Sequence, residues 1–427
     1  MQQTPKGLRL HIGLFGRRNV GKSSLLNALA RQHVSIVSDV PGTTTDPVEK
    51  PMELSPVGPV LFIDTAGVDD VGALGEERIR KTMGVIERTD LAILVTDDWQ
   101  AYEARLLALF GSKKIPVIVV ANKADLRADE ATERAARAVG AACVVTASVP
   151  QRRGLEPLRE AIIATAPAEF LEAPSIVGDL VPPGELVMLV VPIDIEAPKG
   201  RLILPQVQTL RDILDHDGYA MVVKERELAD ALARLSRPPV LVVTDSQEFL
   251  KVVAAVPTEV PLTSFSILFS RFKGDLAAQV RGALAIERLQ PGDRVLIAEA
   301  CAHHPLGEDI GRIKIPRWLE QYVGGKLAFE TWAGRDYPDN LSEYRLVVHC
   351  GACVTNRREM LSRIERASAA GVPITNYGLT IAYSLGILER ALSPFPYAAE
   401  VYRRERAGGK KVAGQAPGSS RGSDPTA

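Results

Sequence analysis

The chain has 427 residues, of which 51 are basic and 52 acidic, so its formal net charge is −1. This length predicts roughly two to four domains, and the balanced charge argues against a dedicated nucleic-acid surface. No apolar run approaches the roughly 18 residues of a membrane helix, and the N-terminus lacks a signal-peptide pattern. We therefore expect a cytoplasmic protein with no membrane span.

The first predicted elements are a strand over residues 8–15, a glycine-rich loop and a helix. The loop, Gly16 to Ser24, reads G-R-R-N-V-G-K-S-S and fits G-x-x-x-x-G-K-S. In such a loop the glycines turn backbone N–H groups toward phosphate oxygens, Lys22 reaches the β- and γ-phosphates, and the Ser23 hydroxyl ligates Mg²⁺. The predicted phosphate-binding residues are Gly16, Asn19, Val20, Gly21, Lys22, Ser23 and Ser24.

Two further loops have the residues of a nucleotide switch. The run 41–46 reads P-G-T-T-T-D, and a hydroxyl such as that of Thr44 completes a magnesium shell when a γ-phosphate is present. The apolar run 60–63 ends in Asp64-Thr65-Ala66-Gly67. We expect Asp64 to hold a magnesium-bound water and the Gly67 N–H to meet the γ-phosphate. Lys22, Thr44, Asp64 and Gly67 are the predicted catalytic residues.

The next loops predict which base is bound. The apolar run 115–120 leads into N-K-A-D, and the run ending at Val145 leads into T-A-S. The Asp125 carboxylate can accept two N–H bonds from guanine, which adenine cannot supply, and a backbone N–H near Ala147 and Ser148 would meet guanine O6. With Asn122 and Lys123, these residues complete the predicted guanine site. All of these loops follow apolar strands, as ligand loops do in open α/β sheets.

Residues 8 to about 165 resemble a small GTPase domain of the translation-factor class, in the branch of MnmE and Era-like proteins. The shared motifs are G-x-x-N-x-G-K-S, P-G-T-T-x-D and D-T-A-G, with Thr45 departing from the frequent arginine. The resemblance implies that Asn19 helps to hold K⁺ beside the phosphates. It also places the hydrophobic Val68 where other GTPases have a water-orienting glutamine, so we expect slow, potassium-stimulated hydrolysis of GTP to GDP and phosphate.

The middle of the chain predicts a second α/β domain without catalytic residues. A segment rich in Pro, Ala and Glu over 166–183 is the expected linker, and strands and helices alternate from Leu186 to Val253. No second phosphate loop and no cluster of catalytic residue types is found there. We therefore expect an assembly surface in this domain.

The last third of the chain contains a pattern typical of a metal site. Cys301-Ala302-His303 and His349-Cys350-Gly351-Ala352-Cys353 each follow a predicted strand, so the two loops are expected to converge. The spacing alone is compatible with structural zinc, with an iron–sulfur cluster on three cysteines, or with a redox dithiol. Cys143, in the first domain, is expected to be a buried small apolar side chain.

C-x-H and H-C-x-x-C behind a GTPase domain resemble the HydF family, the GTPases that mature FeFe-hydrogenase, and the resemblance extends to about residue 405. It implies a 4Fe-4S cluster on Cys301, Cys350 and Cys353, with His303 and His349 near the cluster as possible ligands. It also implies a homodimer built by the middle domain. The cargo would be a diiron precursor made with two radical-SAM maturases and delivered to apo FeFe-hydrogenase.

We therefore predict an α/β protein of three domains with a short tail. The expected parts are a P-loop GTPase with a doubly wound sheet (1–168), an α/β dimerisation domain (169–260), an α/β iron–sulfur cluster domain (261–405) and a disordered tail (406–427). GTP binding is expected to reorder the loops 43–46 and 68–74 and so to gate partner contacts. The rival hypothesis is a ribosome- or tRNA-directed GTPase with structural zinc, against which the near-neutral charge argues.

Overall fold

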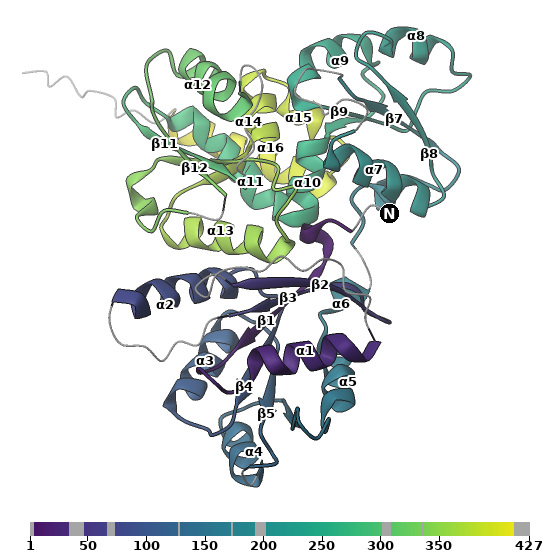
Figure 1. Ribbon diagram of the computed structural model, residues 1–427. Coiled ribbons are helices and arrows are strands. Elements are labelled where there is room, and N and C mark those ends of the chain that lie inside the picture. Colours follow the sequence, from purple (N-terminus) through teal and green to yellow (C-terminus); the bar gives the residue numbers. More distant parts are fainter. Residues whose placement is uncertain are drawn as a thin grey trace, which may run out of the picture. The chain divides into compact units, whose positions relative to one another are not determined.

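The computed structural model describes residues 4–33, 47–65, 73–126, 129–171, 174–192, 202–300, 309–334 and 337–413. The chain divides into two compact units (Figure 1). The first consists of Met1–Pro174 with Val354–Arg363, and the second of Ser175–Cys353 with Ile364–Ala427. Each unit has its own sheets and its own apolar core.

A six-stranded sheet forms the centre of the first unit, in the order β2-β3-β1-β4-β5-β6. Only β2 runs antiparallel to its neighbour, and the other pairs are parallel. The strands are β1 (Leu10–Phe15), β2 (Val48–Leu54), β3 (Gly58–Asp64), β4 (Leu91–Thr96), β5 (Val117–Ala121) and β6 (Cys143–Thr146). The helices are α1 (Lys22–His33), α2 (Ala73–Ile86), α3 (Ala101–Ser112), α4 (Asp129–Ala138), α5 (Leu155–Thr165) and α6 (Ala168–Leu171), with a short 3₁₀ turn at Lys6–Leu8.

The alternation of side chains along the strands explains why helices cover both faces of this sheet. In β3, Val60 and Phe62 belong to one apolar cluster, whereas Leu61 and Ile63 belong to another. Successive strand residues point to opposite faces, so a strand that is apolar at every position needs cover on both. The predicted doubly wound GTPase sheet is confirmed.

Residues 354–363, from the C-terminal third of the chain, belong to the first unit. The Asn356 Nδ2 donates to the Arg88 carbonyl oxygen at 2.9 Å and to both carboxylate oxygens of Asp90. Asp90 in turn accepts the backbone N–H of His11 at 2.9 Å. Asn356 is 1% exposed, so it fixes the amino ends of β1 and β4 from within the core.

The second unit contains two parallel four-stranded sheets, β10-β9-β7-β8 and β12-β11-β13-β14. The strands of the first are β7 (Leu186–Val190), β8 (Tyr219–Val223), β9 (Leu241–Thr244) and β10 (Leu262–Ser264). Those of the second are β11 (Arg294–Glu299), β12 (Ala328–Ala333), β13 (Leu346–His349) and β14 (Ile374–Asn376). One apolar cluster includes residues from both sheets, so the middle and C-terminal segments share a core.

The α-helices between these strands are α7 (Leu204–Asp215), α8 (Leu228–Ala233), α9 (Phe249–Ala255), α10 (Phe265–Lys273), α11 (Leu276–Leu284), α12 (Ile315–Val323), α14 (Tyr377–Ser384), α15 (Leu388–Ala391) and α16 (Pro396–Ala413). Helix α13 (Arg357–Ala369) crosses the boundary between the two units. Shorter 3₁₀ turns lie at Gly178–Leu180, Ser246–Glu248, Ala285–Arg288 and Leu341–Glu343, and a π-helical turn lies at Ile310–Lys314.

Two expected boundaries need correction. The predicted start of the third domain at 261 cuts through the first sheet of the second unit, because β10 pairs with β9 there. This strand has only three residues, too few for a recognisable pattern. The predicted tail from 406 is helical at its start, because α16 continues to Ala413; residues 414–427 lie outside the described residues. Once a helix is nucleated, each further residue adds a hydrogen bond at little cost.

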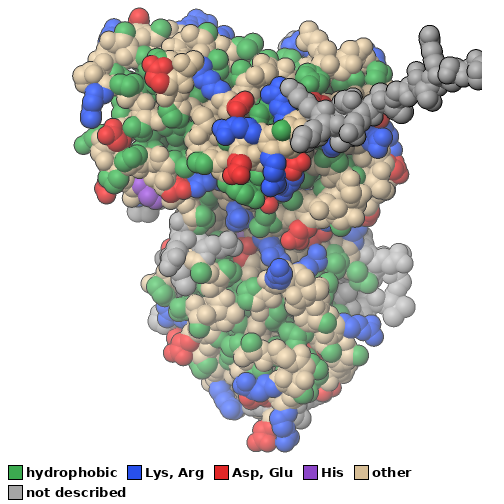
Figure 2. All heavy atoms as spheres, turned by 180° about the vertical axis from the view of Figure 1, so that it is seen from behind, with side chains coloured by type: hydrophobic (Ala, Val, Ile, Leu, Met, Phe, Trp, Pro, Cys, Tyr) green, Lys and Arg blue, Asp and Glu red, His purple; other side chains and the backbone are tan. Residues whose placement is uncertain are grey.

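The described surface carries charges of both signs. On the face drawn in Figure 2, basic and acidic side chains alternate among apolar atoms. Within the described ranges, no helix is both long and apolar enough to cross a membrane.

Candidate functional site

The glycine-rich loop has the backbone that its sequence requires. Gly16 has φ 141° and Gly21 has φ 96°, in the region that favours glycine. A Cβ on Gly16 would lie 2.1 Å from the Val95 carbonyl oxygen, and one on Gly21 would lie 2.4 Å from the Asn122 Nδ2. Both glycines are therefore required by their dihedral angles and by close neighbours.

The lysine of the loop lies folded over it. The Lys22 Nζ donates to the carbonyl oxygens of Gly16 and Arg17, both at 2.8 Å, and the residue is only 7% exposed. An ammonium held across the mouth of a phosphate loop is positioned to exchange carbonyl oxygens for phosphate oxygens. The predicted phosphate role of Lys22 is compatible with this geometry.

The other loop residues differ in exposure and in backbone role. Asn19 is exposed with φ 61°, a left-handed conformation that asparagine tolerates better than most residues, so the backbone alone favours it. Val20 is 1% exposed and packs in the core, while its carbonyl oxygen accepts the Asn122 Nδ2 at 2.8 Å. Ser24 is exposed on the first turn of α1. The potassium role of Asn19 remains a prediction.

Ser23, a predicted magnesium ligand, is in contact with Asp64, which is expected to hold a magnesium-bound water. The Ser23 hydroxyl donates to Asp64 Oδ2, and Asp64 Oδ1 is buried without a hydrogen-bond partner among the described residues. Burial raises the pKa of Asp64, while Ser23, Lys22 and Lys50 oppose that rise. A hydroxyl beside an unpaired carboxylate oxygen suits Mg²⁺, which prefers oxygen ligands. Thr44 and Gly67 lie outside the described residues.

The structure brings the predicted base-reading residues Asn122, Lys123, Asp125 and Ser148 close to one another. The Asp125 carboxylate is exposed and accepts the Ser148 hydroxyl at 2.6 Å, which fixes its orientation. Lys123 has φ 61°, and its Nζ donates to Asp97 Oδ2 at 2.9 Å. Asn122 connects this loop to the phosphate loop through Val20. An exposed, oriented carboxylate is what guanine recognition needs.

The contact of guanine O6 that is expected near Ala147 and Ser148 stays a prediction. The Ala147 N–H donates to the Ala121 carbonyl oxygen at 2.8 Å, and the Ser148 N–H donates to the Arg153 carbonyl oxygen at 3.1 Å. Both belong to backbone ladders that extend beyond β6. The Val149 N–H, one residue further on, donates no hydrogen bond within the described chain. The sequence does not indicate which of these N–H groups are already paired, because it does not specify backbone hydrogen bonds.

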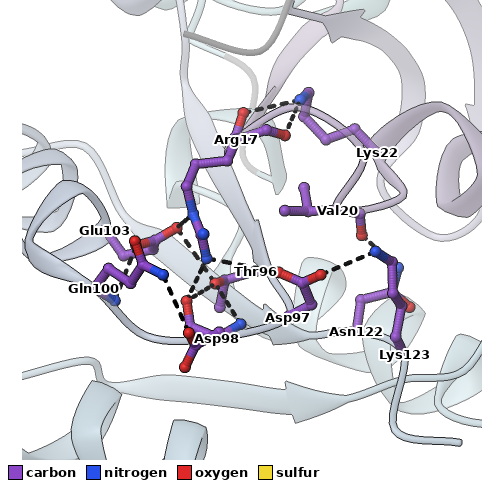
Figure 3. A network of polar contacts seen from close by, with 11 residues as sticks. Arg17, Val20, Lys22, Thr96, Asp97, Asp98, Gln100, Glu103, Asn122 and Lys123 are labelled. Carbon is purple, nitrogen blue, oxygen red and sulfur yellow. Dashed lines mark hydrogen bonds and ion pairs between the residues drawn. The ribbon is translucent and has the colours of Figure 1, made fainter. Parts of the chain in front are cut away.

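A charged network beside the loop was missed by the sequence analysis (Figure 3). The Arg17 Nε donates to Glu103 Oε1 at 2.7 Å, and its Nη2 lies 3.5 Å from Asp97 Oδ1. Burial opposes but does not prevent a raised pKa of Arg17, since Glu103 and Asp97 stabilise its charge. Asp97, bonded to Lys123, thus connects the phosphate loop with the base loop. The position of Asp97 directly after β4 is the sequence feature that could have indicated its place in the site.

The second unit has a cavity of about 230 Å³ at the cysteine motif, well above the roughly 15 Å³ that one water needs. Cys350, Cys353, Glu299, Asp309 and Tyr377 are among its lining residues. Apolar side chains form much of the remaining wall, including Ile203, Phe265, Phe269 and Ile310. The cavity therefore combines sulfur donors with an apolar enclosure.

Hydrogen-bond donors and a buried cation surround the cysteine loop. The Ala300 N–H donates to the Cys350 Sγ at 3.1 Å, and the Cys350 N–H donates to the Ala298 carbonyl oxygen. The Lys273 Nζ donates to the Cys353 carbonyl oxygen at 3.0 Å, and Lys273 is only 1% exposed. One backbone N–H therefore contacts the sulfur of Cys350, and the Lys273 ammonium contacts the backbone of Cys353.

The remaining predicted ligands are only partly placed. His349 is fully buried at the end of β13, and its Nδ1–H donates to the Cys350 carbonyl oxygen at 2.8 Å. It is not among the residues that line the cavity. Cys301 and His303 lie outside the described residues, and within the described chain no group of three metal-binding side chains is found. Cys143 is half-buried in β6, where burial raises the pKa of its thiol.

Two family models match the second unit. Residues 176–274 match the hydrogen maturase F dimerization domain, and residues 277–394 match the hydrogen maturase F tetramerization domain. The chain belongs to the hydrogen maturase F family. The resemblance to HydF stated from the motifs is therefore confirmed. In this family member, residues 11–123 also match a model described as a 50S ribosome-binding GTPase.

The family member is also similar to other GTPases over part of its length. The tRNA modification GTPase MnmE of Bacillus licheniformis is 38% identical over 154 residues, which are 35% of this chain and 33% of that protein. GTPase Der of Wolinella succinogenes is 37% identical over 175 residues, or 38% and 37% of the two chains. This chain thus spans about a third of the length of these relatives. The G domain of the T. maritima FeoB iron transporter aligns with 37% of this chain and 98% of its own, at 27% identity and a TM-score of 0.27.

Proposed function

We propose that this protein is a cytoplasmic GTPase and iron–sulfur scaffold that carries a diiron precursor to apo FeFe-hydrogenase. One observation carries the proposal. Ala300, the residue before Cys301, donates its N–H to the Cys350 Sγ at the wall of the cysteine cavity. The residue that precedes the first cysteine motif therefore contacts the second motif, which supports a metal centre shared by the two. Membership of the maturase family supports the same conclusion.

In the proposed GTP site, the chain's own groups supply binding and orientation. Lys22 moves from carbonyl oxygens to the β- and γ-phosphates, while Ser23 and Asp64 hold Mg²⁺ directly or through water. Bound Mg²⁺ neutralises charge on the phosphates during transfer. Asp125 accepts the guanine N–H groups. The guanine O6 contact is expected at a backbone N–H near Ala147 and Ser148.

We propose slow hydrolysis that K⁺ stimulates, with Asn19 as a potassium ligand and with Thr44 and Gly67 completing the site. The exposed side chain of Asn19 on the loop leaves it accessible to a cation. The test compares GTP turnover in KCl and NaCl for wild type and Asn19→Gly, since glycine retains the left-handed backbone. Equal turnover in both salts for wild type would contradict the potassium role. A selective loss of stimulation in the variant would support it.

The cluster proposal assigns Cys301, Cys350 and Cys353 as ligands, with His303 and His349 nearby. Thiolates, an N–H donor to sulfur and a buried ammonium fit an anionic cluster, which supplies an iron with an open position when bound. The test is anaerobic reconstitution of wild type, Cys350→Ser and the control Cys143→Ser, followed by iron, sulfide and zinc analysis. We expect Cys350→Ser alone to lose most of its iron. Stoichiometric zinc without sulfide in wild type would establish a structural zinc site instead.

We propose that the middle domain forms a homodimer through the free edge of β8. Tyr219 and Val222 of this edge strand are 64% and 42% exposed, and Leu214 at the end of α7 is 55% exposed. An edge strand with exposed large apolar side chains is a template for pairing with a second copy. Val222→Lys should shift the sedimentation profile toward monomer, whereas Leu250→Lys, which changes an exposed leucine of α9, should not. Unchanged oligomer size in Val222→Lys would exclude this edge.

The proposed partners are apo FeFe-hydrogenase and two radical-SAM maturases, with GTP gating their contacts. GTP can shift these equilibria only if it binds two states with different affinity. The test measures partner dissociation rates with and without GTP and K⁺, using wild type and Asp125→Asn. We expect nucleotide to change the rates for wild type and not for the variant. Equal rates under all conditions would refute gating.

A further inference from the structure

Strand register places Tyr377 beside the cysteine motif. Ala298 of β11 pairs with His349 of β13, and His349 pairs with Asn376 of β14. The residues that follow these three are Glu299, the last of β11, Cys350, directly after β13, and Tyr377, the first of α14. These three start in one row at the carboxyl edge of the sheet, where neighbouring strands lie about 4.8 Å apart. All three line the cavity.

The hydroxyl of Tyr377 lacks the partner that a buried donor needs. Its oxygen is buried and makes no hydrogen bond among the described residues. The hydroxyl is closely packed, because a methyl group on Gly311 would lie 2.0 Å from the oxygen. A buried unsatisfied hydroxyl costs stability, and such groups are rare in native proteins. An acceptor supplied by a bound ligand would remove this cost.

The neighbouring carboxylates are already engaged. The Glu299 Oε2 accepts the Arg312 Nη2 at 2.9 Å, and the Asp309 Oδ1 accepts the Arg312 N–H at 2.8 Å. A phenol has an ordinary pKa of about 10, so its hydroxyl carries the proton at neutral pH. The Tyr377 hydroxyl is a neutral donor on a residue that lines the same cavity as Cys350 and Cys353.

We propose that Tyr377 is a ligand-positioning residue whose hydroxyl donates a hydrogen bond to an anionic ligand bound at the cysteine centre. The inference rests on the proposed cluster, because an iron held by three cysteines leaves one coordination position for an outside ligand. The ligand class is a small anion with an acceptor atom, enclosed by the apolar wall. Tyr377 would select such a ligand over a neutral one by supplying a donor.

The test uses the full-length protein after anaerobic reconstitution, as wild type, Tyr377→Phe and Tyr383→Phe. Tyr383 lies on the same helix, but its hydroxyl pairs with that of Tyr322 at 3.4 Å and it does not line the cavity. Iron and sulfide content is measured first, then the cyanide dissociation constant by EPR titration. We expect equal loading of the three proteins. Cyanide should bind Tyr377→Phe about tenfold more weakly, the effect of losing one hydrogen bond to a charged acceptor.

The outcomes separate this inference from the proposed function. Equal cyanide affinity of wild type and Tyr377→Phe, with full clusters in both, would overturn the inference alone and leave the hydroxyl bonded to water. Zinc without sulfide in wild type would overturn the proposed function, and the inference with it. If Tyr377→Phe loads less iron, Gly311→Ala is the second variant. Its added methyl displaces the hydroxyl while keeping the tyrosine, and the same weakening is expected.

Discussion

Replacing Arg17 by leucine is expected to destabilise the GTPase unit, because it leaves the Glu103 carboxylate charged and buried. The Glu103 side chain is fully buried and that of Arg17 is 19% exposed. Breaking a buried ion pair from one side costs about 3–5 kcal/mol, and the partial exposure of Arg17 argues for about 3 kcal/mol. Glu103 retains its bond from the Gln100 N–H at 3.0 Å, which also limits the loss.

The assay uses the fluorescence of Trp99, which is the only one of the chain's three tryptophans in the GTPase region. In a background of Trp318→Phe and Trp332→Phe, fluorescence reports urea unfolding next to the network itself. With an m-value of about 2 kcal/mol per molar urea, a loss of about 3 kcal/mol lowers the midpoint by about 1.5 M. Arg105→Leu, which changes an exposed arginine of α3, is the matched control and should leave the midpoint unchanged.

A double-mutant cycle decides whether the ion pair itself is responsible. The variant with Arg17→Leu and Glu103→Leu together removes both charges, so it should be more stable than Arg17→Leu alone. If the two single losses simply add in the double variant, the contact between Arg17 and Glu103 contributes no coupling energy. The reasoning would then be wrong.

Three further predictions concern the first unit. Burial lowers the pKa of His11 from 6.5 to about 4, so its stabilising contribution is complete above pH 6.5 and falls as pH decreases toward 4. Urea unfolding should therefore lose about 2 kcal/mol between pH 7 and pH 5 from this group, and His11→Gln should show a smaller loss. Asn356→Ala leaves the buried acceptors of Arg88 and Asp90 without this donor, so calorimetry should show the GTPase unit destabilised by about 1–3 kcal/mol. An unchanged melting temperature would contradict this. Asp97→Asn weakens the contact to Lys123 and should raise the dissociation constant for fluorescent GDP about fivefold, whereas an unchanged constant would exclude the link.

The sequence predicted the strands that are apolar on both faces and the loops that follow them. Such strands must be buried between helices. The nucleotide motifs follow the carboxyl ends of parallel strands, so they were expected to lie together at that edge of the sheet. Strand β2 was not predicted, because Pro51 and three charged residues obscure its pattern at the edge of the sheet. The position of Asn356 in the first unit was also unpredictable, because a contact across more than 260 residues leaves no local signal.

At the cysteine cavity the sequence drew attention to Cys350 and Cys353 but not to the residues around them. Cys350 and Cys353 are recognisable by spacing, and the cavity contains both. Tyr377 and Lys273 have no such spacing, and a tyrosine at a helix start or a lysine in an apolar helix is typical of ordinary core and surface positions. Their roles depend on which strands and helices are neighbours, which periodicity does not determine.

The row formed by Glu299, Cys350 and Tyr377 follows from strand register and not from the conformation of any loop. The backbone ladder that pairs Ala298, His349 and Asn376 sets the separation of these side chains, so a conservative substitution at Tyr377 leaves the positions of its neighbours unchanged. A change of ligand affinity in Tyr377→Phe would then be an effect of the missing hydroxyl. This makes the row a better place to test the chemistry of the proposed centre than the cysteines themselves, whose removal would abolish the proposed cluster together with its ligands.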